Sequence, residues 1–191
     1  MKKLYIFDMG GVLTYNTDVF PNIINYLKIT EEEFITYSGE NLRKLIDGKI
    51  GTDEFWTKFS LKYGKKVEEE LFSKFFNPKI NQRTRDIIER LKEISRVVCG
   101  TNTLDSHYDC HLKHGDYNIF DKVYASNKMG VSKPDPDFYW YILREEGVKP
   151  EDTVFIDDTE ENILSAQKIG IKSILFTDPD SLKQQIKSFS D

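Results

Sequence analysis

Four sets of polar residues in this sequence have the types that phosphoryl chemistry requires, and each set lies at or near the carboxyl end of a predicted strand. They are Asp8, Thr101 with Asn102, Lys133, and Asp157 with Asp158. The carboxylates are hard oxygen ligands of the kind that Mg²⁺ prefers, while a hydroxyl and an ammonium group can hold anionic oxygens. A metal ion, a cation and hydrogen-bond donors around one carboxylate describe the surroundings of a phosphoryl group, with that carboxylate as nucleophile.

The segment that leads into Asp8 indicates where these groups meet. Residues 4–7 read Leu-Tyr-Ile-Phe without polar alternation, which is typical of a central parallel strand covered on both faces, and Gly10-Gly11 would end that strand. In an open α/β sheet, ligands bind outside the carboxyl ends of the strands. A lone aspartate at this position could equally cap a turn, so the other three sets carry much of the argument.

The elements that must position these residues alternate along the chain. Apolar runs predict five strands, at 4–7, 97–99, 123–125, 153–156 and 173–176. Helical spacing predicts helices between them, at about 83–93, 104–114 and 135–146, then one ending at Gly170 and a last one at the C-terminus. This alternation predicts an α/β fold with a three-layer parallel sheet and right-handed crossovers.

The stretch between the first two strands is too long for a single crossover. A capping box at Thr30 and Glu33 opens one predicted helix, and three more are expected at about 41–46, 52–64 and 67–76. We therefore expect a small helical insert of residues 16–80 and a core domain formed by residues 1–15 and 81–191. An insert at the carboxyl end of the first strand would act as a lid.

Composition excludes several classes of function. The 191 residues carry a net charge of −5 with a pI near 5.4, which argues against nucleic acid as the main partner. The apolar run after Met1-Lys2-Lys3 is cut short by Asp8, and no later run could span a bilayer, so we expect a cytoplasmic protein without membrane association. The spacing of Cys99 and Cys110 suggests neither a disulfide nor a metal site, which fits a reducing compartment.

Taken together, these segments resemble the haloacid dehalogenase superfamily of hydrolases, in the branch with a small helical cap after the first strand. The four motifs are Phe7-Asp8-Met9-Gly10-Gly11-Val12-Leu13, Cys99-Gly100-Thr101-Asn102, Gly130-Val131-Ser132-Lys133-Pro134-Asp135-Pro136, and Phe155-Ile156-Asp157-Asp158 with Asn162. Any one motif is weak, but four in this order are specific. The resemblance implies a Rossmann-like sheet with strand order 3-2-1-4-5, and within the superfamily it is greatest to small sugar-phosphate phosphatases whose first motif reads Asp-x-Gly.

The resemblance also implies a role for each site residue. Asp8 would be the nucleophile that forms an aspartyl phosphate, and Lys133 and Thr101 would hold the phosphoryl oxygens. Asp8, the backbone carbonyl of Gly10, and Asp157 or Asp158 would bind Mg²⁺. Substrate contacts are expected from Asn102 and Gly10 and, within the insert, from Arg43, although an insert needs solvated cations in any case.

Gly10 is the one departure from the family pattern. Most phosphatases of the superfamily carry a second aspartate there, which protonates the leaving oxygen and then activates water. A general acid typically contributes roughly 10²- to 10⁴-fold to the rate, so turnover of poor leaving groups should suffer. The nearest titratable candidates in the sequence to replace it are Tyr15, Asp18 and Glu40.

We therefore expect a Mg²⁺-dependent phosphatase that acts on a small phosphorylated metabolite, with a sugar phosphate favoured. Dehalogenases and phosphonatases of the superfamily also lack the second aspartate, so a hydrolase of that type is one alternative. A non-catalytic protein that binds a metabolite with the same fold is another. The sequence leaves a monomer and a homodimer equally open.

Two further groups of side chains have alternative interpretations. His107, His111 and His114 fall on one helical face and could chelate a transition metal, but such spacing more often marks a solvated face. The insert's aromatic residues fall on apolar stripes, which favours a small core of the insert over a stacking platform. These are Trp56, Phe72, Phe75 and Phe76.

Overall fold

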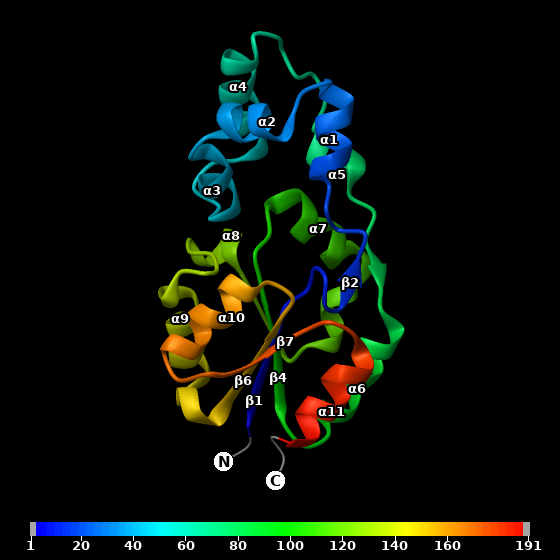
Figure 1. Ribbon diagram of the computed structural model, residues 1–191, viewed down its shortest axis with the longest axis vertical. Coiled ribbons are helices and arrows are strands. Elements are labelled where there is room, and N and C mark those ends of the chain that lie inside the picture. Colours follow the sequence, from blue (N-terminus) through cyan, green and yellow to red (C-terminus); the bar gives the residue numbers. More distant parts are fainter. Residues whose placement is uncertain (1–2, 189–191) are drawn as a thin grey trace.

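The computed structural model describes residues 3–188, so Met1 and Lys2 of the basic start lie outside the described residues. Its main sheet has five parallel strands in the order β5-β4-β1-β6-β7. Their bounds are β1 (Leu4–Phe7), β4 (Arg96–Thr101), β5 (Lys122–Ala125), β6 (Thr153–Asp157) and β7 (Lys172–Leu175). Counted along the chain, this order is the predicted 3-2-1-4-5, with β1 in the centre between β4 and β6 (Figure 1).

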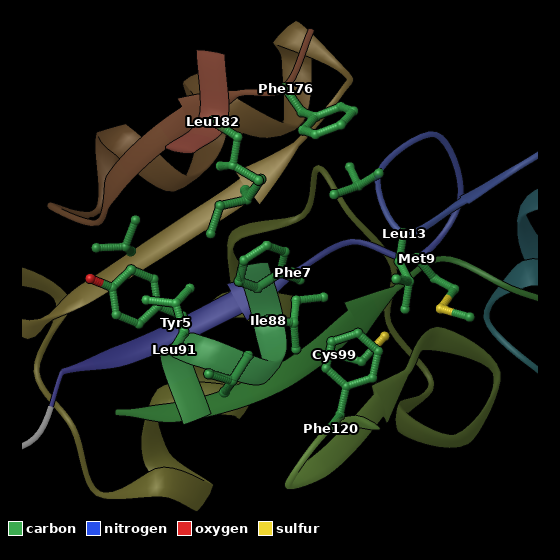
Figure 2. Packing of buried hydrophobic residues seen from close by; sticks show 14 of the residues in the cluster. Tyr5, Phe7, Met9, Leu13, Ile88, Leu91, Cys99, Phe120, Phe176 and Leu182 are labelled. Atoms are coloured by element: carbon green, nitrogen blue, oxygen red, sulfur yellow. The ribbon is translucent and has the colours of Figure 1, made fainter. Parts of the chain in front are cut away.

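The central position of β1 follows from its composition. Tyr5 and Phe7 point into one apolar cluster and Leu4 and Ile6 into another, and all four side chains are buried. Because successive side chains of a strand face opposite sides, a strand covered on both faces reads as an unbroken apolar run. Figure 2 shows Tyr5 and Phe7 among the apolar side chains of the first cluster, together with Ile88.

Helices cover both faces of the sheet and complete the three layers. One face is covered by α6 (Gln82–Lys92), the 3₁₀ helix η1 (Asp116–Ile119) and α11 (Pro179–Ser188). The other is covered by α9 (Pro136–Glu146) and α10 (Glu160–Lys168). Three connecting helices complete this part of the chain: α7 (Asp105–His114), α8 (Ser126–Met129) and the 3₁₀ helix η2 (Pro150–Asp152).

Between the first two strands of the main sheet, five helices gather beyond the carboxyl end of β1 (Figure 1). They are α1 (Phe20–Leu27), α2 (Glu31–Ser38), α3 (Asn41–Ile46), α4 (Thr52–Tyr63) and α5 (Leu71–Phe75). They share a third apolar cluster, rich in aromatic side chains such as Phe55, Phe59 and Phe72. The capping box of α2 is confirmed, since Thr30 and Glu33 each accept a hydrogen bond from the other's backbone N–H.

Two expectations for this stretch were wrong. Helix α1 was not predicted; it starts with Pro21 in its first turn, a position where proline fits because no intrahelical N–H bond is lost. Two short antiparallel strands, β2 (Thr14–Tyr15) and β3 (Lys79–Ile80), were also missed, because two residues are too few to show alternation. They lie at the predicted boundaries of the insert, whose status as a separate domain is still a prediction.

None of the helices within residues 3–188 is both long and apolar enough to cross a lipid bilayer. Cys99 is buried in β4, Cys110 lies part-buried on α7, and both are free thiols.

Candidate active site

The carboxyl ends of three neighbouring strands bring the predicted site residues together. Asp8 follows β1, Asp157 ends β6 on one side of it, and Thr101 ends β4 on the other. The Asp8 N–H donates a hydrogen bond of 2.9 Å to the Ile156 carbonyl, so the pairing of β1 with β6 continues to the nucleophile position. The aspartate side chain is therefore fixed at the edge of the sheet by backbone contacts.

Lys133 lies between two of the carboxylates. Its Nζ atom is 2.9 Å from Asp8 Oδ1 and 2.7 Å from Asp157 Oδ2, and its side chain is only 1% exposed. Burial by itself disfavours the charged ammonium group, but Asp8 and Asp157 outweigh that effect and hold the pKa of Lys133 above its usual range. The lysine is a fixed positive charge beside Asp8.

Asn102 holds the backbone of Lys133 from both sides. Its Oδ1 accepts a 2.8 Å hydrogen bond from the Lys133 N–H, and its Nδ2 donates to the Lys133 carbonyl at 2.9 Å. Asn102 was predicted as a substrate ligand. The structure instead engages its amide in positioning the lysine.

Asp157 is fully buried and is held from several directions. Its Oδ1 accepts hydrogen bonds from the Thr159 N–H at 2.8 Å and from Asn162 Nδ2 at 3.0 Å, while its Oδ2 faces Lys133. Asn162, which belongs to the fourth motif, thus orients the Asp157 carboxylate. Asp157 is therefore immobilised before any ligand arrives.

Asp8 is unusual in its protonation. Burial, the largest influence, and the charge of Asp157 raise its pKa to about 7, against the opposing effect of Lys133. Its Oδ1 also accepts a 2.7 Å hydrogen bond from the Met9 N–H. The Asp8 carboxyl group is therefore only about half ionised near neutral pH. A cation that binds beside it would lower its pKa and stabilise the ionised nucleophile.

The donor set fits Mg²⁺. Asp8, Asp157 and Asp158 each offer a carboxylate oxygen, and these three atoms lie within 4.8 Å of one another. Gly11 has a positive φ of 76°, and a Cβ built there would lie 1.9 Å from Asp158 Oδ2. Because only a glycine leaves this space, the carboxylate of Asp158 can approach the strand end. The sequence motif included Gly11 without revealing this role.

Asp157 and Asp158 differ in the lone pairs that remain for a metal ion. Both oxygens of Asp157 already accept hydrogen bonds from neighbouring residues, whereas the Asp158 carboxylate is contacted by its own backbone N–H and, at 3.4 Å, by the Thr159 hydroxyl. Asp158 is also the more exposed of the two, and burial followed by the charge of Asp157 raises its pKa. The geometry therefore favours Asp158 as the direct ligand and Asp157 as the residue that orients Lys133.

The position of the missing second aspartate is partly filled by Thr17. Gly10 is not among the residues with positive φ, and a Cβ built on it would lie 3.2 Å from Thr17 Oγ1. None of the three predicted proton donors lines the cavity beside Gly10. Tyr15 is 57% exposed on β2, Asp18 caps the start of α1, and Glu40 pairs with Lys44.

A cavity of about 190 Å³ opens beside Gly10, between the strand ends and the helices above them. Its fourteen lining residues are Met9, Gly10, Thr17, Val19, Phe20, Ile46, Phe72, Phe76, Thr101, Asn102, Thr103, Leu104, His107 and His111. Phe72 belongs to the apolar cluster of α1–α5, as predicted. The sequence did not show that Phe72 and Phe76 would also form a wall of this cavity.

The prediction that the three histidines form a solvated face was wrong for two of them. His107 stacks on Phe76 with the ring centres 3.7 Å apart, and His111 is buried with its Nδ1 2.8 Å from Asp116 Oδ2. Burial lowers the pKa of His107 to about 4, and it also lowers the pKa of His111 despite the opposing Asp116 carboxylate. Both rings are therefore neutral at pH 7, and only His114 is exposed.

Arg43 is the predicted site residue that the structure does not bring to the strand ends. Its Nη2 donates a 2.8 Å hydrogen bond to the Ser132 carbonyl, and its Nε lies 3.2 Å from Asp47 Oδ1. The Ser132 hydroxyl also donates to Asp47 Oδ1, at 2.5 Å. The guanidinium group thus ties α3 to the residue before Lys133, a contact for which the sequence carries no signal.

Comparison with known proteins identifies several relatives of this chain. A sesquiterpene phosphatase of Aspergillus oryzae is 27% identical over 183 residues, covering 92% of this chain and 90% of that protein. A D-ribitol-5-phosphate phosphatase of Bacteroides thetaiotaomicron is 25% identical and covers 91% of each chain. A drimenol cyclase of Aspergillus calidoustus is 38% identical over 74 residues, and this match spans 14% of the cyclase.

Among solved structures, a haloacid dehalogenase-family enzyme from Bacteroides thetaiotaomicron, in complex with magnesium and inorganic phosphate, superposes on this chain with a TM-score of 0.75. It is 27% identical, and the superposition covers 93% of this chain and 95% of that one. The sequence model of the haloacid dehalogenase-like hydrolase family matches residues 5–176 of this chain. This match covers most of the chain, and the strand order and the buried Asp8 agree with it. The chain therefore belongs to the haloacid dehalogenase-like hydrolase family.

Proposed function

We propose that this hydrolase is a Mg²⁺-dependent phosphatase that cleaves a small phosphate monoester through an aspartyl-phosphate intermediate. The observation that carries the proposal is the position of Asp8, buried between the Lys133 ammonium group and the carboxylates of Asp157 and Asp158. Its relatives include two phosphatases that match over nine-tenths of the chain, which supports a phosphate ester as substrate.

The residues of the site suggest the following course. A carboxylate oxygen of Asp8 attacks phosphorus, the bond from phosphorus to the leaving oxygen breaks, and the alcohol leaves as it gains a proton. Water then attacks the same phosphorus, the bond to Asp8 breaks, and inorganic phosphate departs. Lys133 and the Thr101 hydroxyl would hold the phosphoryl oxygens and stabilise the charge that builds on them.

Asp8, Asp158 and the Gly10 carbonyl would hold the Mg²⁺ ion. When bound, the ion supplies positive charge for the phosphoryl oxygens and neutralises the repulsion among the carboxylates. Asp157 keeps Lys133 in place through its 2.7 Å contact, and Asn102 fixes the backbone of the same lysine. Lys133 is therefore held by two separate parts of the chain, the end of β6 and the loop after β4.

The five helices α1–α5 would form the cap that covers the site and contributes to specificity. The sequence favoured a sugar phosphate as substrate, and the ribitol-phosphate phosphatase among the relatives supports that choice. The sesquiterpene phosphatase supports an apolar alcohol instead. A cytoplasmic location remains our proposal for the compartment.

The test is release of phosphate from a panel of phosphate esters, with and without Mg²⁺, by wild type and by Asp8→Asn. The amide is nearly isosteric but cannot attack phosphorus, so activity should fall by about 10³-fold or more. Asp109→Asn, an exposed aspartate on α7, is the matched control and should keep wild-type activity. Wild type should also bind beryllofluoride at Asp8 when Mg²⁺ is present.

Other outcomes would favour the alternatives. Substantial phosphatase activity in pure Asp8→Asn would rule out the covalent mechanism. Halide release from a haloacid would favour a dehalogenase, and saturable binding of a metabolite without turnover would favour a binding protein.

A further inference from the structure

The cavity beside Gly10 has the position of a leaving-group site. It shares Gly10 and Thr101 with the phosphoryl end of the active site, and it extends from there toward α1, α5 and α7. Half of its lining residues are apolar: Met9, Val19, Phe20, Ile46, Phe72, Phe76 and Leu104. An ester bound with its phosphoryl group at Asp8 would place its alcohol part against these side chains.

Three of the polar side chains that line the cavity already have a partner within the protein. The Asn102 amide binds the Lys133 backbone, His107 Nε2 lies 3.3 Å from the Phe72 carbonyl, and His111 Nδ1 contacts Asp116. None of the fourteen lining residues is Lys, Arg, Asp or Glu. Thr17 has its hydroxyl at the Gly10 end, next to the phosphoryl group.

This arrangement is unfavourable for a sugar or a polyol. Each hydroxyl of such a leaving group that lies against the apolar half of the wall would lose its hydrogen bonds to water without gaining a partner, which is costly. An apolar group suffers no such loss. The wall therefore selects against the sugar phosphate that the sequence favoured.

Size and shape favour a single aromatic ring. A cavity of about 190 Å³ is somewhat larger than the roughly 150 Å³ that admits benzene in a protein core. The Phe76 and His107 rings are stacked at an interplanar angle of 8°, and Phe20 meets Phe72 edge-on. Rings of this kind pack favourably against the edge or face of another aromatic ring.

The absence of an acid at Gly10 also favours an aryl ester, because of the acidity of the leaving group. Phenols are far more acidic than sugar alcohols, so a phenolate leaves with little protonation. An enzyme without a carboxylic acid at that position is therefore better matched to an aryl ester than to an alkyl ester.

We propose that the cavity binds the leaving group of the substrate and that the substrate is an aryl phosphate, the phosphate monoester of a compact, single-ring phenol. This inference rests on the proposed phosphatase function. It adds the specificity-determining wall, whose apolar members include Ile46 on α3 and Phe76 just after α5.

The test compares 4-ethylphenyl phosphate with 4-(hydroxymethyl)phenyl phosphate. The two esters match in size and nearly match in leaving-group acidity, so they differ mainly in one hydroxyl that the wall would have to bury. We expect kcat/KM to be about 10- to 100-fold higher for the ethyl compound, with the difference mostly in KM. D-ribitol 5-phosphate should be a poorer substrate than either.

Ile46→Asn places a polar group in the wall and should reduce the preference for the ethyl compound about tenfold. Ile35→Asn makes the same change at a side chain that is 59% exposed on α2 and does not line the cavity, so it should keep the wild-type preference. If Ile46→Asn does not fold, the comparison of the two esters on wild type still decides.

The outcomes separate this inference from the proposed function. Equal kcat/KM for the two esters, or a preference for D-ribitol 5-phosphate, would overturn the aryl site and leave the phosphatase intact. A preference that Ile46→Asn retains in full would place the leaving group elsewhere. No turnover of any phosphate ester would overturn the phosphatase and this inference with it.

Discussion

At the scale of single residues, the site is governed by how charges are shared among Asp8, Lys133 and Asp157. One buried ammonium group contacts both carboxylates, while a third carboxylate, Asp158, is close by without a cation of its own. The site has more negative than positive charge, and this imbalance contributes to the raised pKa of Asp8.

Mg²⁺ should therefore stabilise the protein more at high pH than at low pH. The folded-state pKa of Asp8, about 7, lies above its ordinary value of 3.8, so without metal this residue makes the protein less stable as pH rises from about 4 to about 7. Mg²⁺ binding requires the ionised carboxylate and should remove that loss. Melting temperatures between pH 5 and 8, with Mg²⁺ and with a chelator, measure the effect. Asp8→Asn should flatten the chelator profile, and an unchanged profile would contradict the assignment.

Gly10→Asp should restore part of the missing proton donor. The backbone at Gly10 accepts a side chain, and Thr17 needs to yield by only a few tenths of an ångström. We expect turnover of alkyl phosphates to rise about 10- to 100-fold and that of aryl phosphates to change little. Gly10→Ala adds the Cβ without the acid and is the control. If Gly10→Asp binds Mg²⁺ normally and the ratio of aryl to alkyl rates does not change, another group already supplies the proton.

At this scale the sequence was informative about some residues and silent about others. Asp8, Asp157 and Asp158 could be predicted because they lie where apolar strands end, and parallel strands all end on the same side of the sheet. Lys133 lies beyond β5 and α8 and was predicted from the third motif. The contacts of Arg43 could not, because the length and charge of a side chain on a short helix do not reveal which carbonyl it will meet.

At the scale of elements, the link between α3 and the loop that carries Lys133 is the closest tie between the helices and the site. Asp47 follows α3 and is 5% exposed. Burial, the largest influence, would raise its pKa, but hydrogen bonds from Ser132 and Lys49 and the charge of Arg43 together lower it. The ionised form is therefore the one that stabilises the fold.

Asp47→Asn should lower the free energy of unfolding by about 2 kcal/mol, because charge-assisted hydrogen bonds to a buried carboxylate are lost. The folded-state pKa of Asp47 is depressed, so its contribution is present above about pH 4 and disappears as the pH falls further. Urea unfolding of the two proteins at pH 7 and pH 3 measures the difference. Glu40→Gln removes an exposed pair at the start of the same helix and should leave the free energy of unfolding close to that of wild type. Equal effects of the two substitutions would show that the α3 link is energetically unimportant.

The elements themselves were predicted well where their periodicity is long. The strands of the main sheet and helices α6, α9 and α10 carry complete apolar faces, and the capping box located α2. Helix α1 was not predicted because the proline near its start reads as a helix breaker. Strands β2 and β3 were not predicted because two residues are too few to show an alternating pattern. The cavity also escaped prediction, since its wall is assembled from four separate segments.

At the scale of the whole molecule, the apolar side chains divide into three clusters. Two lie on the faces of the sheet, and the third lies among α1–α5 and includes only Leu104 from outside that region. Such a division suggests that the helical region can lose order while the sheet keeps it.

Phe55→Ala tests this division. Phe55 is fully buried in the third cluster, and its truncation should cost about 3–5 kcal/mol. We expect hydrogen exchange to accelerate in α1–α5 while β1, β4 and β6 keep their protection. Leu61→Ala, at a side chain that is 80% exposed on α4, should leave exchange unchanged throughout. Equal loss of protection in the sheet would mean that the two regions unfold as one unit.

Gly11 has a consequence at the level of the gene. Every single-base change of a glycine codon that replaces glycine by another amino acid adds a Cβ atom, and at this position that atom would collide with the carboxylate of Asp158. At Gly10 the same mutations meet only the movable side chain of Thr17. Two adjacent glycine codons thus face very different selection: an amino-acid change at the first can be accommodated and can introduce an acid, whereas every amino-acid change at the second meets the Asp158 carboxylate.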